Sequence, residues 1–121
     1  MLSIDALRAW GADTDDGMKR CMNNEALYLR LVDKAARDAS YDKLKAAAEA
    51  RDFSAAFELA HALKGVTANL SLTPLQKPVS EMSDLLKAGT DMDYGPLLRD
   101  ILTARDALLE LLKTKAAHKN P

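Results

Sequence analysis

The side chains best suited to chemistry in this sequence gather around His61, which is followed by Lys64 and Gly65. A neutral imidazole nitrogen can act as a nucleophile, a general base or a metal ligand. On a helix, a lysine three residues later extends from the next turn of the same face, so its ammonium can offset negative charge at the imidazole. Glycine has no side chain, so another molecule can approach the backbone closely. These three residues define the candidate site.

Residues 53–72 have the periodicity of an amphipathic helix. At about 100° per residue, one side of this helix is a continuous apolar stripe that consists of Ala56, Leu59, Leu63, Val66 and Leu70. Such a stripe is typical of a surface that faces a protein core. The opposite side carries His61 together with Ser54, Glu58, Gly65, Ala68 and Leu72. The pattern therefore predicts that the imidazole points towards solvent.

Three interpretations of His61 have little support. A metal site needs several converging ligands, but the second histidine of the chain is His118, near the C-terminus. A di-metal site in a helical bundle needs two Glu-x-x-His pairs, and Glu58 with His61 is a single one. A catalytic triad needs a nucleophile, an orienting acid and a pocket, which Lys64, Gly65, Ala68 and Asn69 do not supply. A histidine enclosed in the core conflicts with its position opposite the apolar stripe.

The remaining interpretation is a nucleophile presented to a partner protein. An imidazole nitrogen can accept a phosphoryl group and release it again, because the N–P bond is labile. Lys64 would offset the charge of the phosphoryl oxygens, and Ala68 and Leu72 would add small apolar area for docking. Glycine inside a helix costs about 1 kcal/mol relative to alanine. On an outward face, this cost favours close approach of a partner as the reason for Gly65.

Length and composition indicate one ordinary domain. The chain has 121 residues, 48% hydrophobic and 29% charged, with a net charge of −1. It therefore has no excess of basic charge for nucleic acid. Its single cysteine, Cys21, cannot form an internal disulfide and fits a reducing compartment. The N-terminus lacks the pattern of a signal peptide, and no apolar run approaches the roughly 20 residues that span a membrane. We expect a soluble, cytoplasmic monomer.

Helical periodicity recurs along the chain, and no alternating strand pattern appears. We expect short helices within residues 2–10 and 15–22, and longer ones over 53–72 and 96–116. Residues 25–39 and 41–50 form either one bent helix or two. Pro78 either marks the start of the helix that ends at Gly89 or kinks it. Short connections favour an antiparallel four-helix bundle with one or two short extra N-terminal helices, over residues 1–121 as a single domain, with 117–121 as a frayed tail.

The sequence around the candidate site resembles that of the histidine phosphotransfer (HPt) family. His61-Ala62-Leu63-Lys64-Gly65, followed by Ala68-Asn69-Leu70, is similar to the family pattern H-x-L-K-G-x-x-x-x-L-G. The resemblance extends over nearly the whole chain and implies a stand-alone phosphorelay carrier with a four-helix bundle fold. By this resemblance, His61 would be phosphorylated, with Lys64 and Gly65 beside it. Ala68, Asn69 and Leu72 would form the surface on which a receiver domain docks.

Two positions depart from the family pattern. Ser71 stands where family members usually have glycine, and we expect this small residue to be tolerated. Many members also carry a glutamine or glutamate on the next helix that orients the histidine. By spacing, that position falls at Ser83, with Glu81 and Asp84 nearby. Ser83 is therefore the candidate orienting group.

The resemblance also implies the partners and cofactors. Receiver domains of response regulators or hybrid sensor kinases would exchange the phosphoryl group with His61, and they would supply the magnesium ion. The sequence has no glycine-rich loop of the Walker or kinase type, so we expect no ATP-dependent kinase activity and no cofactor. The alternative hypothesis is an inert helical adaptor that docks receivers or another partner without carrying phosphate. A metal-binding bundle is a weaker third hypothesis.

Overall fold

The computed structural model describes residues 2–118, with side chains through residue 113, and this part of the chain consists of helices and short connections without strands. The helices are α1 (Ile4–Trp10), α2 (Thr14–Arg20), α3 (Glu25–Ala36), α4 (Ser40–Glu49), α5 (Phe53–Asn69), α6 (Thr73–Lys87) and α7 (Gly95–His118). The predicted all-α class is confirmed. α7 continues past the predicted end at residue 116, and 119–121 lie outside the described residues.

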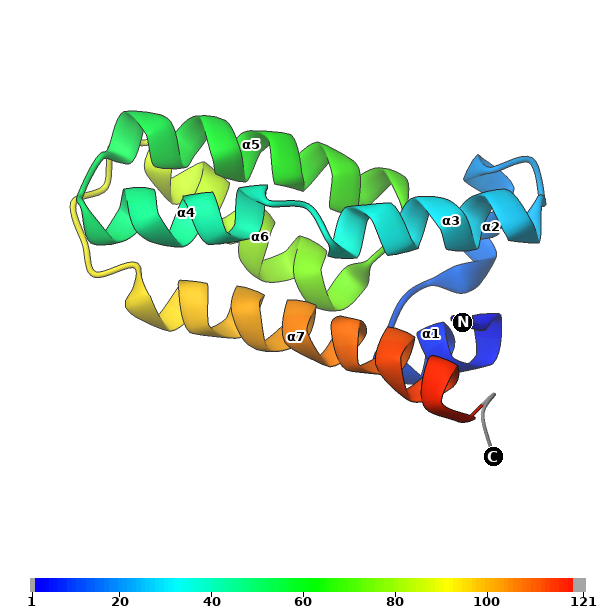
Figure 1. The fold of residues 1–121 in the computed structure, drawn as a ribbon. Helices are drawn as coiled ribbons and strands as arrows, with labels where there is room; N and C mark the ends of the chain where they lie inside the picture. The colour runs from blue at the N-terminus through cyan, green and yellow to red at the C-terminus, as the bar shows by residue number, and fades with distance from the viewer. Residues whose placement is uncertain (1, 119–121) are drawn as a thin grey trace.

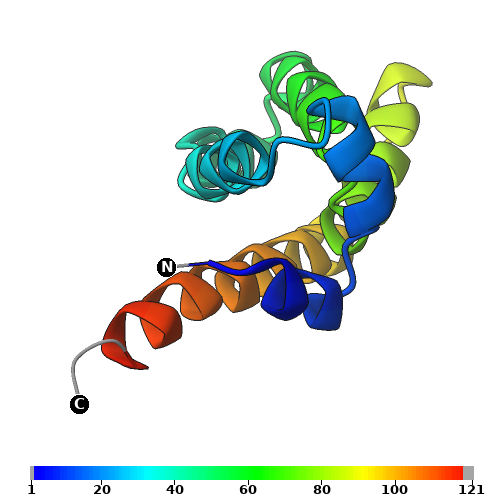
Figure 2. The same ribbon diagram turned by 90° about the vertical axis from the view of Figure 1, so that its right-hand side faces the viewer.

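The helices form a bundle in which α5, α6 and α7 each run antiparallel to the helix before them (Figure 1). α3 and α4 lie end to end and together occupy one position of the bundle, beside α5. α6 and α7 complete it, and the view from one end shows all four positions (Figure 2). The short helices α1 and α2 lie at the end of the bundle where α3 begins. The predicted four-helix bundle with short N-terminal helices is confirmed, and the segment 25–50 consists of two helices.

Six of the helices contribute buried hydrophobic residues to the core, and Met18 of α2 packs against it. Its largest fully buried side chains include Tyr28 of α3, Leu44 of α4, Leu63 of α5, Met82 of α6 and Ile101 of α7. Burial of large apolar side chains typically contributes about 1.5–3 kcal/mol each. None of the helices within residues 2–118 has the length and apolar composition that crossing a bilayer requires.

Pro78 lies inside α6, which begins five residues earlier at Thr73. Leu72 is the N-cap and makes no side-chain cap hydrogen bond, but its carbonyl accepts from the backbone amides of Leu75 at 2.9 Å and Gln76 at 2.8 Å. α6 therefore starts at Thr73, with Pro74 in its first turn, and the alternative that the helix starts at Pro78 is wrong. The residues of α6 that face the core are those expected for one helix that begins at Thr73.

A Schellman motif ends α5 and turns the chain inward. The Leu72 amide donates to the Thr67 carbonyl at 2.9 Å, the Ser71 amide donates to Ala68 at 3.1 Å, and Ser71 adopts a φ of +54°. Glycine adopts this left-handed conformation most easily, which explains why glycine suits the position of Ser71. The predicted tolerance of serine has a structural basis, since the Ser71 hydroxyl donates to Asp16 at 2.5 Å. This hydrogen bond, followed by one from Arg20, lowers the pKa of Asp16.

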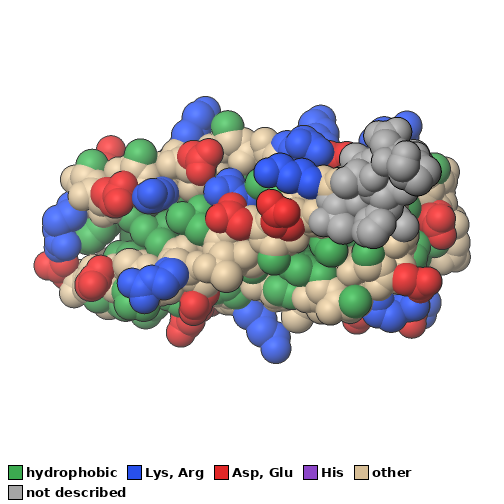
Figure 3. Space-filling view, turned by 60° about the horizontal axis from the view of Figure 1, so that its bottom comes forward, with side chains coloured by type: hydrophobic (Ala, Val, Ile, Leu, Met, Phe, Trp, Pro, Cys, Tyr) green, Lys and Arg blue, Asp and Glu red, His purple; other side chains and the backbone are tan. Residues whose placement is uncertain are grey.

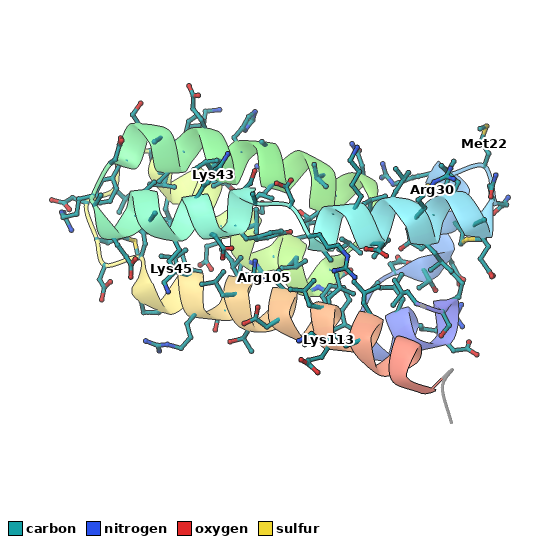
Figure 4. All side chains as sticks on the ribbon, viewed as in Figure 1. Met22, Arg30, Lys43, Lys45, Arg105 and Lys113 are labelled. Atoms are coloured by element: carbon teal, nitrogen blue, oxygen red, sulfur yellow. The ribbon has the colours of Figure 1, made fainter. Side chains whose placement is uncertain are left out.

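Arg105 connects the last helix to α4. Its guanidinium extends from α7 towards α4 (Figure 4) and lies 3.3 Å from the Asp42 carboxylate and 2.8 Å from that of Asp106. It also lies 5.6 Å from the ring centroid of Tyr41, a distance that permits a cation–π interaction. With a side chain only 13% exposed, Arg105 fixes α7 against the α3–α4 position of the bundle.

Two buried tyrosines provide a matched test of hydrogen bonding in the core. Tyr28 donates its hydroxyl proton to the Leu70 carbonyl at 2.8 Å, whereas the Tyr41 hydroxyl has no hydrogen-bond partner in the described chain. Burial raises the pKa of Tyr28 to about 12, which keeps this donor protonated.

We expect Tyr28→Phe to lower the free energy of unfolding by about 1–2 kcal/mol, because it leaves the Leu70 carbonyl without this donor. Tyr41→Phe should be neutral or stabilising, because it removes an unsatisfied buried hydroxyl. Urea denaturation of both variants checks this expectation. Equal losses of stability would contradict it.

Candidate functional site

His61 lies in the middle of α5, and its side chain is exposed. The side chains of α5 that are buried are Ala56, Ala60, Leu63 and Thr67. The predicted apolar stripe is therefore displaced, since Leu59 and Val66 are only half-buried. Thr67 can face the core because its hydroxyl donates to the Leu63 carbonyl at 2.8 Å. The displacement leaves the predicted orientation of His61 unchanged.

The imidazole of His61 stacks on Phe57, one turn earlier in α5. The ring centroids lie 5.5 Å apart with an interplanar angle of 25°. Phe57 is half-buried, so it supports one face of the imidazole and leaves the ring nitrogens free of the core. Sequence reasoning missed Phe57, although its spacing of four residues from His61 was a sufficient signal.

Lys64 projects from the turn that follows His61 and reaches the next helix. Its ammonium donates to Asp84 of α6 at 2.9 Å, and the two side chains are 40% and 64% exposed. A positive charge is therefore held at the edge of the histidine-bearing face. From the sequence alone, Asp84 is only a neighbour of the predicted orienting position, Ser83.

Gly65 is exposed on the same face of α5 as His61. Apart from its chain neighbours and the backbone of its own helix, a Cβ atom built at Gly65 would meet no described atom within 4 Å. Packing within the described chain therefore does not require glycine here. At Gly17, by contrast, an added Cβ would overlap the ring of Tyr28. Glycine at position 17 is thus explained by packing inside the protein. At position 65 it leaves free space on the outer surface of α5.

An open groove runs between α3 and α5 and reaches the C-terminal turn of α5. It has a volume of about 670 Å³ and a mainly apolar lining that includes Leu31, Ala35, Val66, Asn69 and Leu70. Lys34, Arg37 and Asp38 complete its wall. Of the predicted docking residues, Asn69 is exposed and lines this groove, and Ala68 is half-buried.

Leu72 does not lie on the exposed face, and its predicted place there is wrong. Its side chain is fully buried. The predicted helix includes Leu72, but α5 ends at Asn69, and the left-handed conformation at Ser71 directs Leu72 into the core. The docking surface therefore cannot include this residue.

Ser83 does not orient His61. It is only 2% exposed and lies on the core-facing side of α6 with Leu75, Val79, Met82 and Leu86. No hydrogen bond joins it to His61 in the described chain. Because successive residues on a helix are about 100° apart, the next residue, Asp84, points outward and meets Lys64.

Two further features of the described chain are the charge on the face that carries α7 and the grouping of metal-ligand side chains. On the face that carries α7, acidic and basic side chains lie among hydrophobic ones, and no histidine appears among the described side chains of this view (Figure 3). Among the described side chains, residues 2–113, no group of three or more histidine, cysteine or acidic side chains could hold a metal ion.

Comparison with protein families identifies the class that this fold and site define. The model of the Hpt domain matches residues 30–115, which extend from within α3 to near the end of α7. The chain belongs to the Hpt domain family. Comparisons with functionally curated proteins and with solved structures found no match. Hpt domains are phosphoryl carriers with a histidine phosphotransfer role in phosphorelays, and they generally interact with receiver domains.

Proposed function

We propose that this protein relays a phosphoryl group between the aspartates of receiver domains through phosphohistidine at His61. The observation that supports this proposal best is the exposed imidazole in the middle of α5, with Lys64 and Gly65 on the following turn. The site needs no internal nucleophile or pocket, because the partner brings the rest of the reacting groups.

The transfer is a reversible substitution at phosphorus. A lone pair of the neutral His61 imidazole attacks the phosphorus of an aspartyl phosphate, so an N–P bond forms while the acyl O–P bond breaks. The aspartate leaves as a carboxylate, and the imidazole loses its remaining N–H proton to solvent or keeps it as phosphoimidazolium. The reverse reaction on a second receiver regenerates neutral imidazole. Phe57 limits rotation of the ring by stacking against one face.

Lys64 and Gly65 assist the transfer in different ways. The Lys64 ammonium offsets the negative charge of the phosphoryl oxygens, which is worth more when a docked receiver excludes water. Gly65 leaves room for the receiver backbone, as the open space at the position of an added Cβ indicates. The docking surface that we propose for the receiver is the α3–α5 groove. Asn69 lies in its wall, and Ala68 is the preceding residue of α5.

Transfer from a phosphorylated receiver domain tests the proposal. The wild-type protein should acquire label that is lost in acid and retained in base, whereas His61→Gln should acquire none. Binding of the variant to the same receiver is measured in parallel. If the wild type binds receivers but never becomes labelled, the protein is a docking adaptor and the proposal is wrong.

A further inference from the structure

A single ion pair joins α5 to α6 in the described part of the chain, and it involves the lysine of the proposed phosphoryl site. Lys64 Nζ lies 2.9 Å from Asp84 Oδ1. The other described charged side chains of these two helices are Glu58 of α5 and Lys77, Glu81 and Lys87 of α6. None of them forms an ion pair with a described side chain of residues 2–113. The carboxylate of Asp84 is thus the anion that the Lys64 ammonium contacts before any phosphoryl group arrives.

A phosphoryl group on His61 would compete for the same ammonium. A phosphoryl group carries about −1.5 to −2 charges near neutral pH, compared with −1 for a carboxylate. The Lys64–Asp84 pair is exposed on both sides, and such pairs contribute little to stability. Lysine also has a flexible stem with three donors, so the ammonium can change partner without movement of either helix.

We propose that Asp84 is a positioning residue that acts through Lys64. In the unphosphorylated protein it holds the ammonium at α6, and after phosphorylation the ammonium turns to the phosphoryl oxygens. No bond to phosphorus forms or breaks at Asp84. Its carboxylate competes for Lys64 and so limits how strongly phosphohistidine is stabilised, which keeps the group transferable to the next receiver. This inference rests on the proposed function of His61.

The second pKa of the phosphoryl group on His61 shows whether the Lys64 ammonium contacts the phosphoryl oxygens or Asp84. Inorganic phosphoramidate phosphorylates histidine without a receiver, because the imidazole displaces ammonia from phosphorus. ³¹P NMR then follows the second ionisation of the phosphoryl group with pH. A nearby cation favours the dianion and lowers this pKa. The His118→Gln background removes the second histidine of the chain from the spectrum.

In this background, we expect Asp84→Asn to lower the phosphoryl pKa by about half a unit, because it frees Lys64. Lys64→Gln should raise this pKa, and adding Asp84→Asn to Lys64→Gln should change nothing further. Glu81→Gln is the matched control, since Glu81 is an exposed carboxylate one turn earlier on α6 that forms no ion pair in the described chain. It should leave the pKa unchanged.

The outcomes separate this inference from the proposed function. An unchanged pKa in Asp84→Asn overturns the inference, as does an equal shift in Glu81→Gln. A shift of the same size in the Lys64→Gln background also overturns it, because Asp84 would then act on the phosphoryl group directly. Absence of phosphohistidine at residue 61 of the wild type contradicts the proposed function itself, and the inference with it.

Discussion

Replacing Gly65 with alanine is expected to make the protein more stable and a poorer phosphoryl acceptor from receivers. Alanine in a helix interior is favoured over glycine by about 1 kcal/mol. Beyond the backbone of α5 and the two chain neighbours, the added methyl group meets no described atom within 4 Å. The free energy of unfolding should therefore rise. Transfer should nevertheless slow, because the methyl group occupies the space that we assign to the receiver.

A larger side chain at the same position makes the test sharper. Gly65→Gln should slow transfer from a phosphorylated receiver by about a hundredfold, since displacement of reacting groups by about 1 Å can have an effect of this size. The same variant should react with phosphoramidate as fast as the wild type, because this small donor needs no docking surface. Transfer from the receiver at the wild-type rate would show that Gly65 provides no clearance.

Gly17→Ala is expected to have the opposite effect on stability. Gly17 is buried in α2, and an added Cβ would overlap the ring of Tyr28. Overpacking of this kind costs about 1–3 kcal/mol, which exceeds the gain in helix propensity. Movement of Tyr28 would also weaken its hydrogen bond to the Leu70 carbonyl at the end of α5. Urea denaturation should show a clear loss of stability.

The two glycine variants serve as controls for each other. Both place alanine in a helix, so any difference between them arises from the surroundings of the added methyl group. A stabilised Gly17→Ala protein would show that α2 can shift away from Tyr28 without loss of packing, and the assigned role of Gly17 would be wrong. Far-UV circular dichroism confirms that both variants retain their helices.

The sequence was sufficient to predict the exposure of His61, because helical periodicity depends on local residue spacing. The same reasoning failed at Leu72. The wheel assumes that the helix continues, but a serine in the left-handed conformation ends it first, and serine gives a weaker signal for that conformation than glycine does. The predicted helix ends three residues too late, at 72 where α5 ends at Asn69, and this error placed a buried leucine on the predicted surface.

Contacts between helices could not be predicted from the local spacing of residues. The pairing of Lys64 with Asp84 depends on the register of α5 against α6, and the proposed role of Ser83 assumed a register taken from the family pattern. Similarly, the buried side of α5 includes Ala60 and Thr67, because α5 packs against both α4 and α6. A helical wheel predicts one apolar side of α5, but it does not show that two neighbouring helices cover different sides of it. The Phe57–His61 stack, in contrast, lies within one helix and was predictable.

The most direct test of the account is to locate the phosphoryl group on the chain after transfer from a receiver. The phosphorylated protein is digested and its fragments are sequenced by mass spectrometry under alkaline conditions, which preserve phosphohistidine. The chain contains two histidines, and the account predicts modification of His61 with none at His118. Phosphate at His118, on an aspartate, or nowhere on a protein that binds receivers would contradict it.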